Sequence, residues 1–84
     1  MERKIIDMLC GRFPQLCVAD VRVDGDSVYM TVDGGVEGWR VAAAVFGEFP
    51  PVRYVYLCRP ECFDTWVYTR RTLAALLNDN ELYV

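Results

Sequence analysis

The fold is decided by the stretch CVADVRVDGDSVYMTVD, residues 17–33. Apolar and polar residues alternate along it with a period of two, on both sides of Asp24-Gly25-Asp26. Asp-Gly between two alternating runs is typical of a β-hairpin, because glycine accepts the positive φ that a tight turn requires. The period predicts a core face and an outer face. The core face carries Val21, Val23, Val28, Met30 and Val32, and the outer face carries Asp20, Arg22, Tyr29, Thr31 and Asp33.

A helix is predicted on each side of this hairpin. The first, which Pro14 ends, has the apolar stripe Ile6, Leu9, Cys10 and Phe13. The second follows the loop at residues 33–38, with Glu37 near the positive end of its dipole. Its stripe is Trp39, Ala42, Ala43, Phe46 and Phe49. Gly47 suits a left-handed C-terminal cap, and Pro50-Pro51 ends the unit.

The second half of the chain contains two further strands and a last helix. Residues 52–58 are rich in β-branched and aromatic residues and are apolar on both faces, which is typical of a central strand. Residues 63–69 are predicted as a strand, although Phe63, Trp66 and Val67 also fit a helix that begins at Pro60. The last helix carries Leu73, Leu76 and Leu77, with Thr69 or Thr72 as its cap.

These elements predict one small α+β domain over residues 1–84, in the order α-β-β-α-β-β-α. We expect a mostly antiparallel sheet of about four strands, with helices packed on one face. Strand order does not follow from the sequence. The predicted core consists of Ile6, Leu9, Phe13, Val21, Val23, Met30, Val32, Trp39, Phe46, Val55, Leu57, Leu73, Leu76 and Leu77.

Composition and charge exclude several classes of protein. With 54% hydrophobic residues the chain is too apolar for disorder. The net charge of −3 disfavours binding to phosphate backbones or anionic membranes. The longest apolar run, residues 41–46, is far shorter than the roughly 20 residues that span a bilayer, and the first residues have no hydrophobic signal core. We therefore expect a soluble protein of the cytoplasm.

Metal binding and catalysis find little support in the sequence. Cys10, Cys17, Cys58 and Cys62 have spacings unlike a zinc knuckle, and without histidine we expect buried, reduced thiols, no metal and no cofactor. Asp24 and Asp26 lie in a tight turn, so turn chemistry explains both better than acid–base catalysis. We expect no enzyme.

A recognition surface is the sharper alternative to a merely solvated acidic face. Five of the twelve acids lie in one short stretch, and Arg22 is the cation within it. Carboxylates along a hairpin, with an aromatic among them, can imitate a row of phosphates and occupy a basic channel on a partner. The predicted partner-binding residues are Asp20, Asp24, Asp26, Tyr29, Asp33 and Glu37.

In size, charge and lack of catalytic groups, the chain resembles phage-encoded inhibitors of host systems, including anti-CRISPR proteins, although no motif carries the resemblance. It implies a non-enzymatic protein that inhibits or modulates a larger protein or nucleoprotein complex, in the host cytoplasm if phage-encoded. One alternative is a small RNA-binding module that uses Arg53, Arg59, Arg70 and Arg71 beside aromatic rings. Another is a structural subunit of an assembly.

Overall fold

The structure, a computed structural model, describes residues 1–60 and 62–82, without the side chains of residues 62–64 and 78–82. The elements are α1 (Glu2–Arg12), β1 (Cys17–Asp24), β2 (Ser27–Asp33), α2 (Gly38–Glu48), β3 (Tyr54–Arg59), β4 (Cys62–Thr69) and α3 (Arg70–Leu82). This is the predicted order, and the ambiguous segment before the last helix is a strand. The thiol of Cys62, for which reduction was predicted, lies outside the described side chains.

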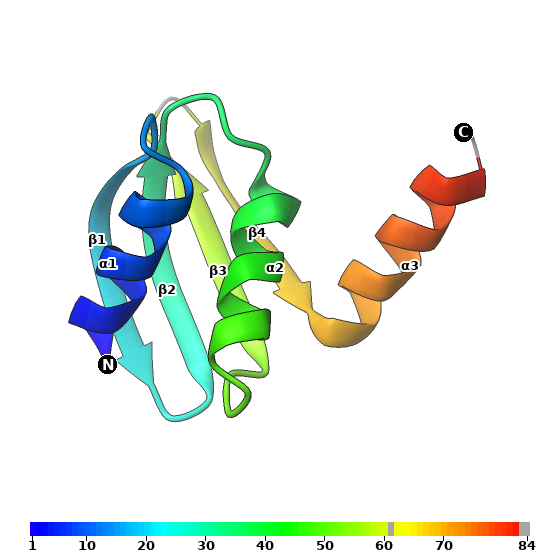
Figure 1. Cartoon of the computed structure of the whole chain (residues 1–84), viewed down its shortest axis with the longest axis horizontal. Helices are drawn as coiled ribbons and strands as arrows, with labels where there is room; N and C mark the ends of the chain where they lie inside the picture. The colour runs from blue at the N-terminus through cyan, green and yellow to red at the C-terminus, as the bar shows by residue number, and fades with distance from the viewer. Residues whose placement is uncertain (61, 83–84) are drawn as a thin grey trace.

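The described strands form one four-stranded sheet in the order β1-β2-β3-β4 (Figure 1). β1 and β2 are antiparallel, as are β3 and β4, whereas β2 and β3 are parallel. The parallel pair arises because α2 forms the crossover that carries the chain back between β2 and β3. Two of the three strand pairs are therefore antiparallel, and β3 is central, as predicted.

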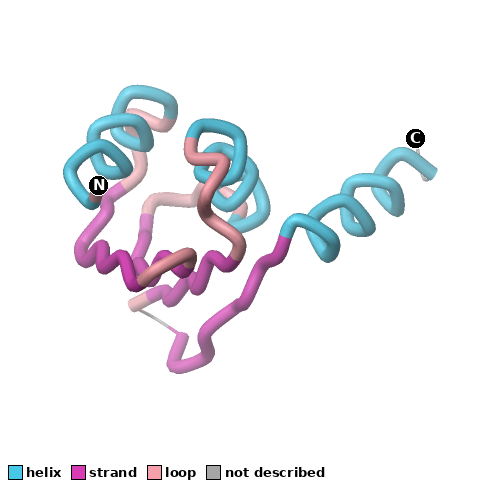
Figure 2. Tube along the Cα trace, turned by 90° about the horizontal axis from the view of Figure 1, so that it is seen from below, coloured by secondary structure: helices cyan, strands magenta, loops and turns pink. Residues whose placement is uncertain are grey.

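Two helices cover one face of the sheet and leave the other face uncovered. Seen from below, α1 and α2 lie side by side above the strands (Figure 2). The third helix, α3, contacts α2 and β4 and then extends away from the body (Figures 1 and 2). Within the described residues, no helix is long and apolar enough to cross a membrane.

The core lies between the sheet and the two covering helices, and the hairpin supplies it as its period predicted. Val28, Met30 and Val32 of β2 are buried, while Val21 and Val23 on the edge strand β1 are half-buried. Further along the chain the prediction is confirmed for Leu9, Phe46, Val55, Leu57 and Leu73.

The buried stripes of the first two helices differ from the predicted ones. In α1, Ile5 and Leu9 are buried, whereas Ile6 and Phe13 are half-buried. In α2, Val41 and Val45 are buried and Trp39 is only half-buried. In α1 the adjacent apolar residues Ile5 and Ile6 offer two neighbouring choices of inner face. α2 is apolar over most of its circumference, and such a helix does not define its inner face by periodicity. The packing against the sheet chooses the face instead.

Two further predictions about burial were wrong. Leu76 is 39% exposed, because α3 extends away from the body as it continues beyond β4. Cys10 and Cys17 are exposed free thiols and not buried ones. The first lies on the solvent side of α1, and the second faces away from the core opposite Asp33. Cys58 is half-buried.

Local chemistry explains the turns and helix ends. Gly25 has φ of 61° in the two-residue turn between β1 and β2, which suits the glycine-first hairpin turn. Thr69 caps α3, since its hydroxyl accepts the N–H of Thr72 at 3.1 Å, while the Thr72 hydroxyl accepts the N–H of Thr69 at 2.9 Å. Gly47 is not the predicted left-handed cap, because α2 continues through Glu48.

Candidate interaction face

The side of the sheet turned away from α1 and α2 is called the open face here, and its side chains form rows across the strands. The strand register aligns Arg22, Tyr29, Tyr56 and Val67 in one row. The neighbouring row contains Asp20, Thr31, Cys58 and Thr65, and the row on the other side contains Asp24, Ser27, Tyr54 and Thr69. Because side chains alternate along a strand, these residues share the face opposite the core.

The central row contains a three-membered stack. The rings of Tyr29 and Tyr56 are parallel within 10°, with their centroids 4.5 Å apart. The guanidinium carbon of Arg22 lies 4.6 Å from the centroid of the Tyr29 ring. Since Arg22 and Tyr56 come from the strands on either side of β2, they cover opposite faces of Tyr29. This ring is therefore held between a cation and a second ring, a rigid arrangement for a half-buried aromatic.

A shallow hollow of about 340 Å³ lies between the central row and the row of Asp20. Its walls combine two tyrosines, two threonines, a thiol, a carboxylate and a guanidinium with apolar side chains. They come from all four strands: Asp20, Val21, Arg22, Tyr29, Met30, Thr31, Tyr56, Cys58 and Thr65. Concave surfaces with an apolar lining and a few polar groups are typical of binding sites.

Three of the predicted carboxylates belong to the open face. Asp20 and Asp24 flank Arg22 on the edge strand β1, and both are exposed. Asp33 ends β2 opposite Cys17, where its carboxylate accepts the N–H of Gly34 at 2.9 Å. Together with Tyr29, these acids confirm the outer face that the hairpin period predicted.

The other two predicted acids lie outside the rows. Asp26 is in the hairpin turn, where its carbonyl accepts the N–H of Arg53 at 2.8 Å and its carboxylate lies 4.0 Å from the guanidinium of Arg53. Glu37 is the N-cap residue of α2, and its carboxylate accepts the indole N–H of Trp39. The five acids thus lie along one edge and at two ends of the sheet, and not in a single row.

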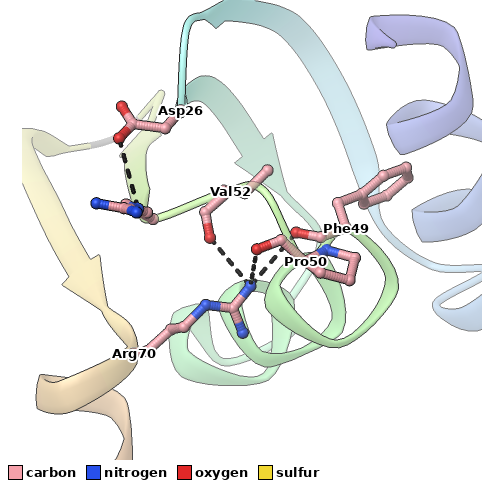
Figure 3. A network of polar contacts seen from close by, with 6 residues as sticks. Asp26, Phe49, Pro50, Val52 and Arg70 are labelled. Atoms are coloured by element: carbon pink, nitrogen blue, oxygen red, sulfur yellow. Dashed lines mark hydrogen bonds and ion pairs between the residues drawn. The ribbon is translucent and has the colours of Figure 1, made fainter.

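Three of the four arginines considered for RNA binding make contacts within the protein. Arg59 donates to the carbonyl of Val36, and Arg53 lies beside Asp26. One guanidinium nitrogen of Arg70 donates to the carbonyls of Phe49, Pro50 and Val52 at 3.4, 2.9 and 3.0 Å (Figure 3). The fourth, Arg71, is exposed on the first turn of α3.

A second hollow, of about 250 Å³, opens on the helix-bearing side between α2, β3 and β4. It is lined by Glu37, Gly38, Leu57, Arg59, Trp66 and Tyr68. Tyr68 leans over the start of α2, since a Cβ at Gly38 would lie 2.7 Å from its hydroxyl. Burial raises the pKa of Tyr68 above its ordinary value, and the charge of Arg59 opposes that rise.

Sequence reasoning missed the partners of Tyr29. Tyr56 completes the stack, and Cys58 and Thr65 complete the hollow, although nothing in the sequence states that β2 lies beside β3. Within the described residues, no three side chains of His, Cys, Asp or Glu gather as a metal site would require. Comparisons with protein-family models, curated proteins and solved structures give no match.

Proposed function

We propose that this chain is a non-enzymatic binding protein that docks through its open face on a basic surface of a larger partner, and thereby inhibits or modulates it. One observation carries the proposal: a sheet face without covering helices holds a stacked pair of tyrosines bordered by carboxylates. Uncovered faces with aromatic anchors are characteristic of interfaces, where tyrosine and arginine are enriched among the residues that dominate binding.

The stack makes the open face suitable for recognition. Tyr29 has little rotational freedom to lose on binding, because Arg22 and Tyr56 already cover its two ring faces. A preorganised side chain costs less conformational entropy when a partner immobilises it. The hollow beside the stack offers a concave seat for one side chain of the partner.

Charge supports a basic partner. Among the described side chains, the open face carries Asp20, Asp24 and Asp33 against one cation, Arg22. Asp26 and Glu37 add negative charge at the two ends of the sheet. A groove that binds nucleic acid has the complementary arginines and lysines, so imitation of a phosphate row is the mode we favour. This fits an inhibitor of the phage-encoded, anti-CRISPR-like kind that acts in the cytoplasm.

RNA binding is the second candidate, because aromatic rings and Arg22 on an uncovered sheet are also how single strands are bound. Two contacts favour the first candidate over it. Both faces of the Tyr29 ring are occupied by protein groups and are closed to a stacking base. Arg59 and Arg70 already donate to backbone carbonyls, although Arg53, 4.0 Å from Asp26, is exposed. Titration with single-stranded RNA over a series of salt concentrations separates the candidates. An RNA-binding module should bind, with an affinity that falls linearly with salt concentration on logarithmic axes, whereas the first candidate should show no binding even at low salt.

The test of the proposed function compares two neutralised proteins as baits in the native host. One carries Asp20→Asn, Asp24→Asn, Asp26→Asn, Asp33→Asn and Glu37→Gln. The matched control carries Glu2→Gln, Asp7→Asn and Glu48→Gln, which remove exposed acids from the helices. We expect the control to retain the wild-type partner and the five-acid variant to lose it. With that partner purified, the association rate should fall as salt rises and should fall again in the five-acid variant. Equal affinity for all three proteins would refute the proposal.

A further inference from the structure

The two edges of the sheet are protected very differently. β1 carries Asp20, Arg22 and Asp24, has a register shift between Val18 and Asp20, and contacts α1. Charges, bulges and covering elements are the means by which natural sheets prevent an edge strand from pairing with another chain. At the other edge, β4 has one charged residue, Asp64, a register shift in its pairing with β3, and contacts with α2 and α3, but its last five residues, 65–69, read TWVYT, without a charge or a proline. Over residues 65–69 this edge lacks the charges that protect β1.

Both sides of the unprotected edge present apolar surface. Trp66 is 44% exposed and Val67 is 50% exposed. Consecutive residues of a strand point to opposite faces, so Trp66 lies with Leu57 on the helix-bearing face and Val67 lies with Tyr56 on the open face. An exposed edge strand that is apolar on both faces can pair with a strand of another chain and so extend the sheet.

The apolar stripe of α3, the helix that follows this edge, is only partly covered by the rest of the protein. Leu73 is buried in the first turns of α3, but Leu76 is 39% exposed and Leu77 is half-buried. The helix extends beyond the β4 edge on the helix-bearing side of the sheet (Figures 1 and 2). Leu76 is therefore the exposed part of this apolar stripe, on a helix that extends beyond the edge where another chain would lie.

We propose that the occupant of this edge is a second copy of the same chain. The two β4 strands pair antiparallel about a two-fold axis beside Trp66 and Val67, and each α3 packs on the helix-bearing face of the other copy. An antiparallel pairing places the partner copy's Thr69, and so the start of its α3, at the end of the sheet where β4 begins. The second hollow, with Glu37, Arg59 and Trp66, opens at that end.

Shape and charge favour a second copy over an extended peptide of another protein. A peptide added to β4 covers the edge but leaves the stripe of α3 exposed, whereas a two-fold pair covers both at once. The rotation also brings the exposed Arg71 on the first turn of α3 toward Glu37 of the other copy, a pair of opposite charge. The open faces stay free, so this interface and the proposed docking face coexist.

Sedimentation velocity over a series of concentrations tests the proposal. The wild-type chain should sediment as a species of about twice its 9.6 kDa mass. Val67→Lys places two ammonium groups face to face near the axis, and Leu76→Lys charges the stripe of α3. Each should weaken dimerisation by about tenfold or more. Both positions are exposed, so circular dichroism should show a folded chain. Ala19→Lys adds the same charge to the exposed part of β1 and should leave the dimer intact.

Mixing gives a test that misfolding cannot imitate. Val67→Glu alone should also be monomeric, whereas an equimolar mixture of Val67→Glu and Val67→Lys should dimerise, because opposite charges then meet at the axis. In the wild type, dilution should expose the backbone amides of β4 to hydrogen exchange before those of β2. A wild-type chain that stays monomeric at high concentration would overturn the proposal. So would a dimer that Val67→Lys and Leu76→Lys leave unchanged.

Discussion

Tyr29 and Tyr56 stack across the parallel pair β2 and β3, with ring centroids 4.5 Å apart, although 27 positions separate them in the sequence. The stack joins the N-terminal hairpin to the C-terminal one on the face that no helix covers. It is therefore both a structural link between the two halves of the sheet and the centre of the proposed docking face.

A double-mutant cycle measures this link. Tyr29→Ala and Tyr56→Ala should each lower the free energy of unfolding, and the double variant should lose less than the sum of the two. The coupling should be about 0.5–1.5 kcal/mol, as for other aromatic pairs. Urea unfolding, followed by circular dichroism, gives the change in unfolding free energy for each of the three variants. Strict additivity would mean that the rings do not stabilise one another in solution.

Gly34 is required by a close backbone approach. A Cβ at this position would lie 2.3 Å from the carbonyl oxygen of Gln15, and φ is 126°. Gly34→Ala should therefore lower the unfolding free energy by about 1–3 kcal/mol or more. Gly47→Ala is the matched control, because it lies exposed within α2 with nothing near its Cβ position. It should stabilise the protein by about 0.4–1 kcal/mol. Similar thermal midpoints for the two variants would contradict the observed loop.

The hairpin shows how far sequence reasoning reaches. Val28, Met30 and Val32 are buried and Asp20, Tyr29 and Asp33 face outward because a period of two leaves one choice of faces. In α2 the same reasoning favoured Trp39 over Val41 and Val45, because a helix rich in apolar residues has several possible inner faces. Only the sheet beneath it selects one.

Strand order explains what the sequence could not reveal about the candidate site. Tyr29 was predicted on the outer face, but its contact with Tyr56 depends on the crossover by α2, which leaves no pattern in either strand. The exposed Leu76 has a similar origin. Its spacing fits a core stripe, and the direction in which α3 leaves β4 decides that it stays at the surface.

Arg70 fixes the start of α3 to the loop after α2. Its guanidinium donates to three carbonyls and lies 5.0 Å from the centroid of the Phe46 ring (Figure 3). Arg70→Met keeps the aliphatic stem and removes the donors, and should cost about 1–2 kcal/mol, since hydrogen bonds to a charged group are the stronger ones. Arg71→Met, one residue further on the exposed side, should change stability by less than about 0.5 kcal/mol. Thermal unfolding compares the two. Equal losses of stability in the two variants would mean that water satisfies the three carbonyls as well as the Arg70 guanidinium does.

Neutralising the acids of the proposed docking face should scarcely affect folding. Asp20 and Asp24 are exposed, and Asp26 lies 4.0 Å from an exposed Arg53. Exposed charges of this kind contribute at most about 1 kcal/mol each. The five-acid variant should therefore unfold close to the wild-type midpoint in denaturant, and its slope against denaturant should be unchanged. A large loss of stability would assign these acids a structural role. A loss of partner binding in the same variant would then reflect unfolding and not a damaged docking face.

Tyr68 should make the protein sensitive to alkali. Burial raises the pKa of its phenol above the ordinary value of 10.0, although the nearby Arg59 opposes the shift. The folded chain therefore holds this proton more tightly than the unfolded chain. The resulting stability is fully present below pH 10.0 and is lost as the pH rises through the higher pKa of the folded state. Tyr68→Phe has no proton to lose, so its thermal midpoint should fall less between neutral and strongly alkaline pH than that of the wild type. Tyrosinate absorbance, measured on the same samples, shows whether tyrosine ionises at a lower or a higher pH than the one at which the chain unfolds. If the midpoints of the two proteins fall in parallel, the phenol of Tyr68 is as well solvated in the folded chain as in the unfolded one.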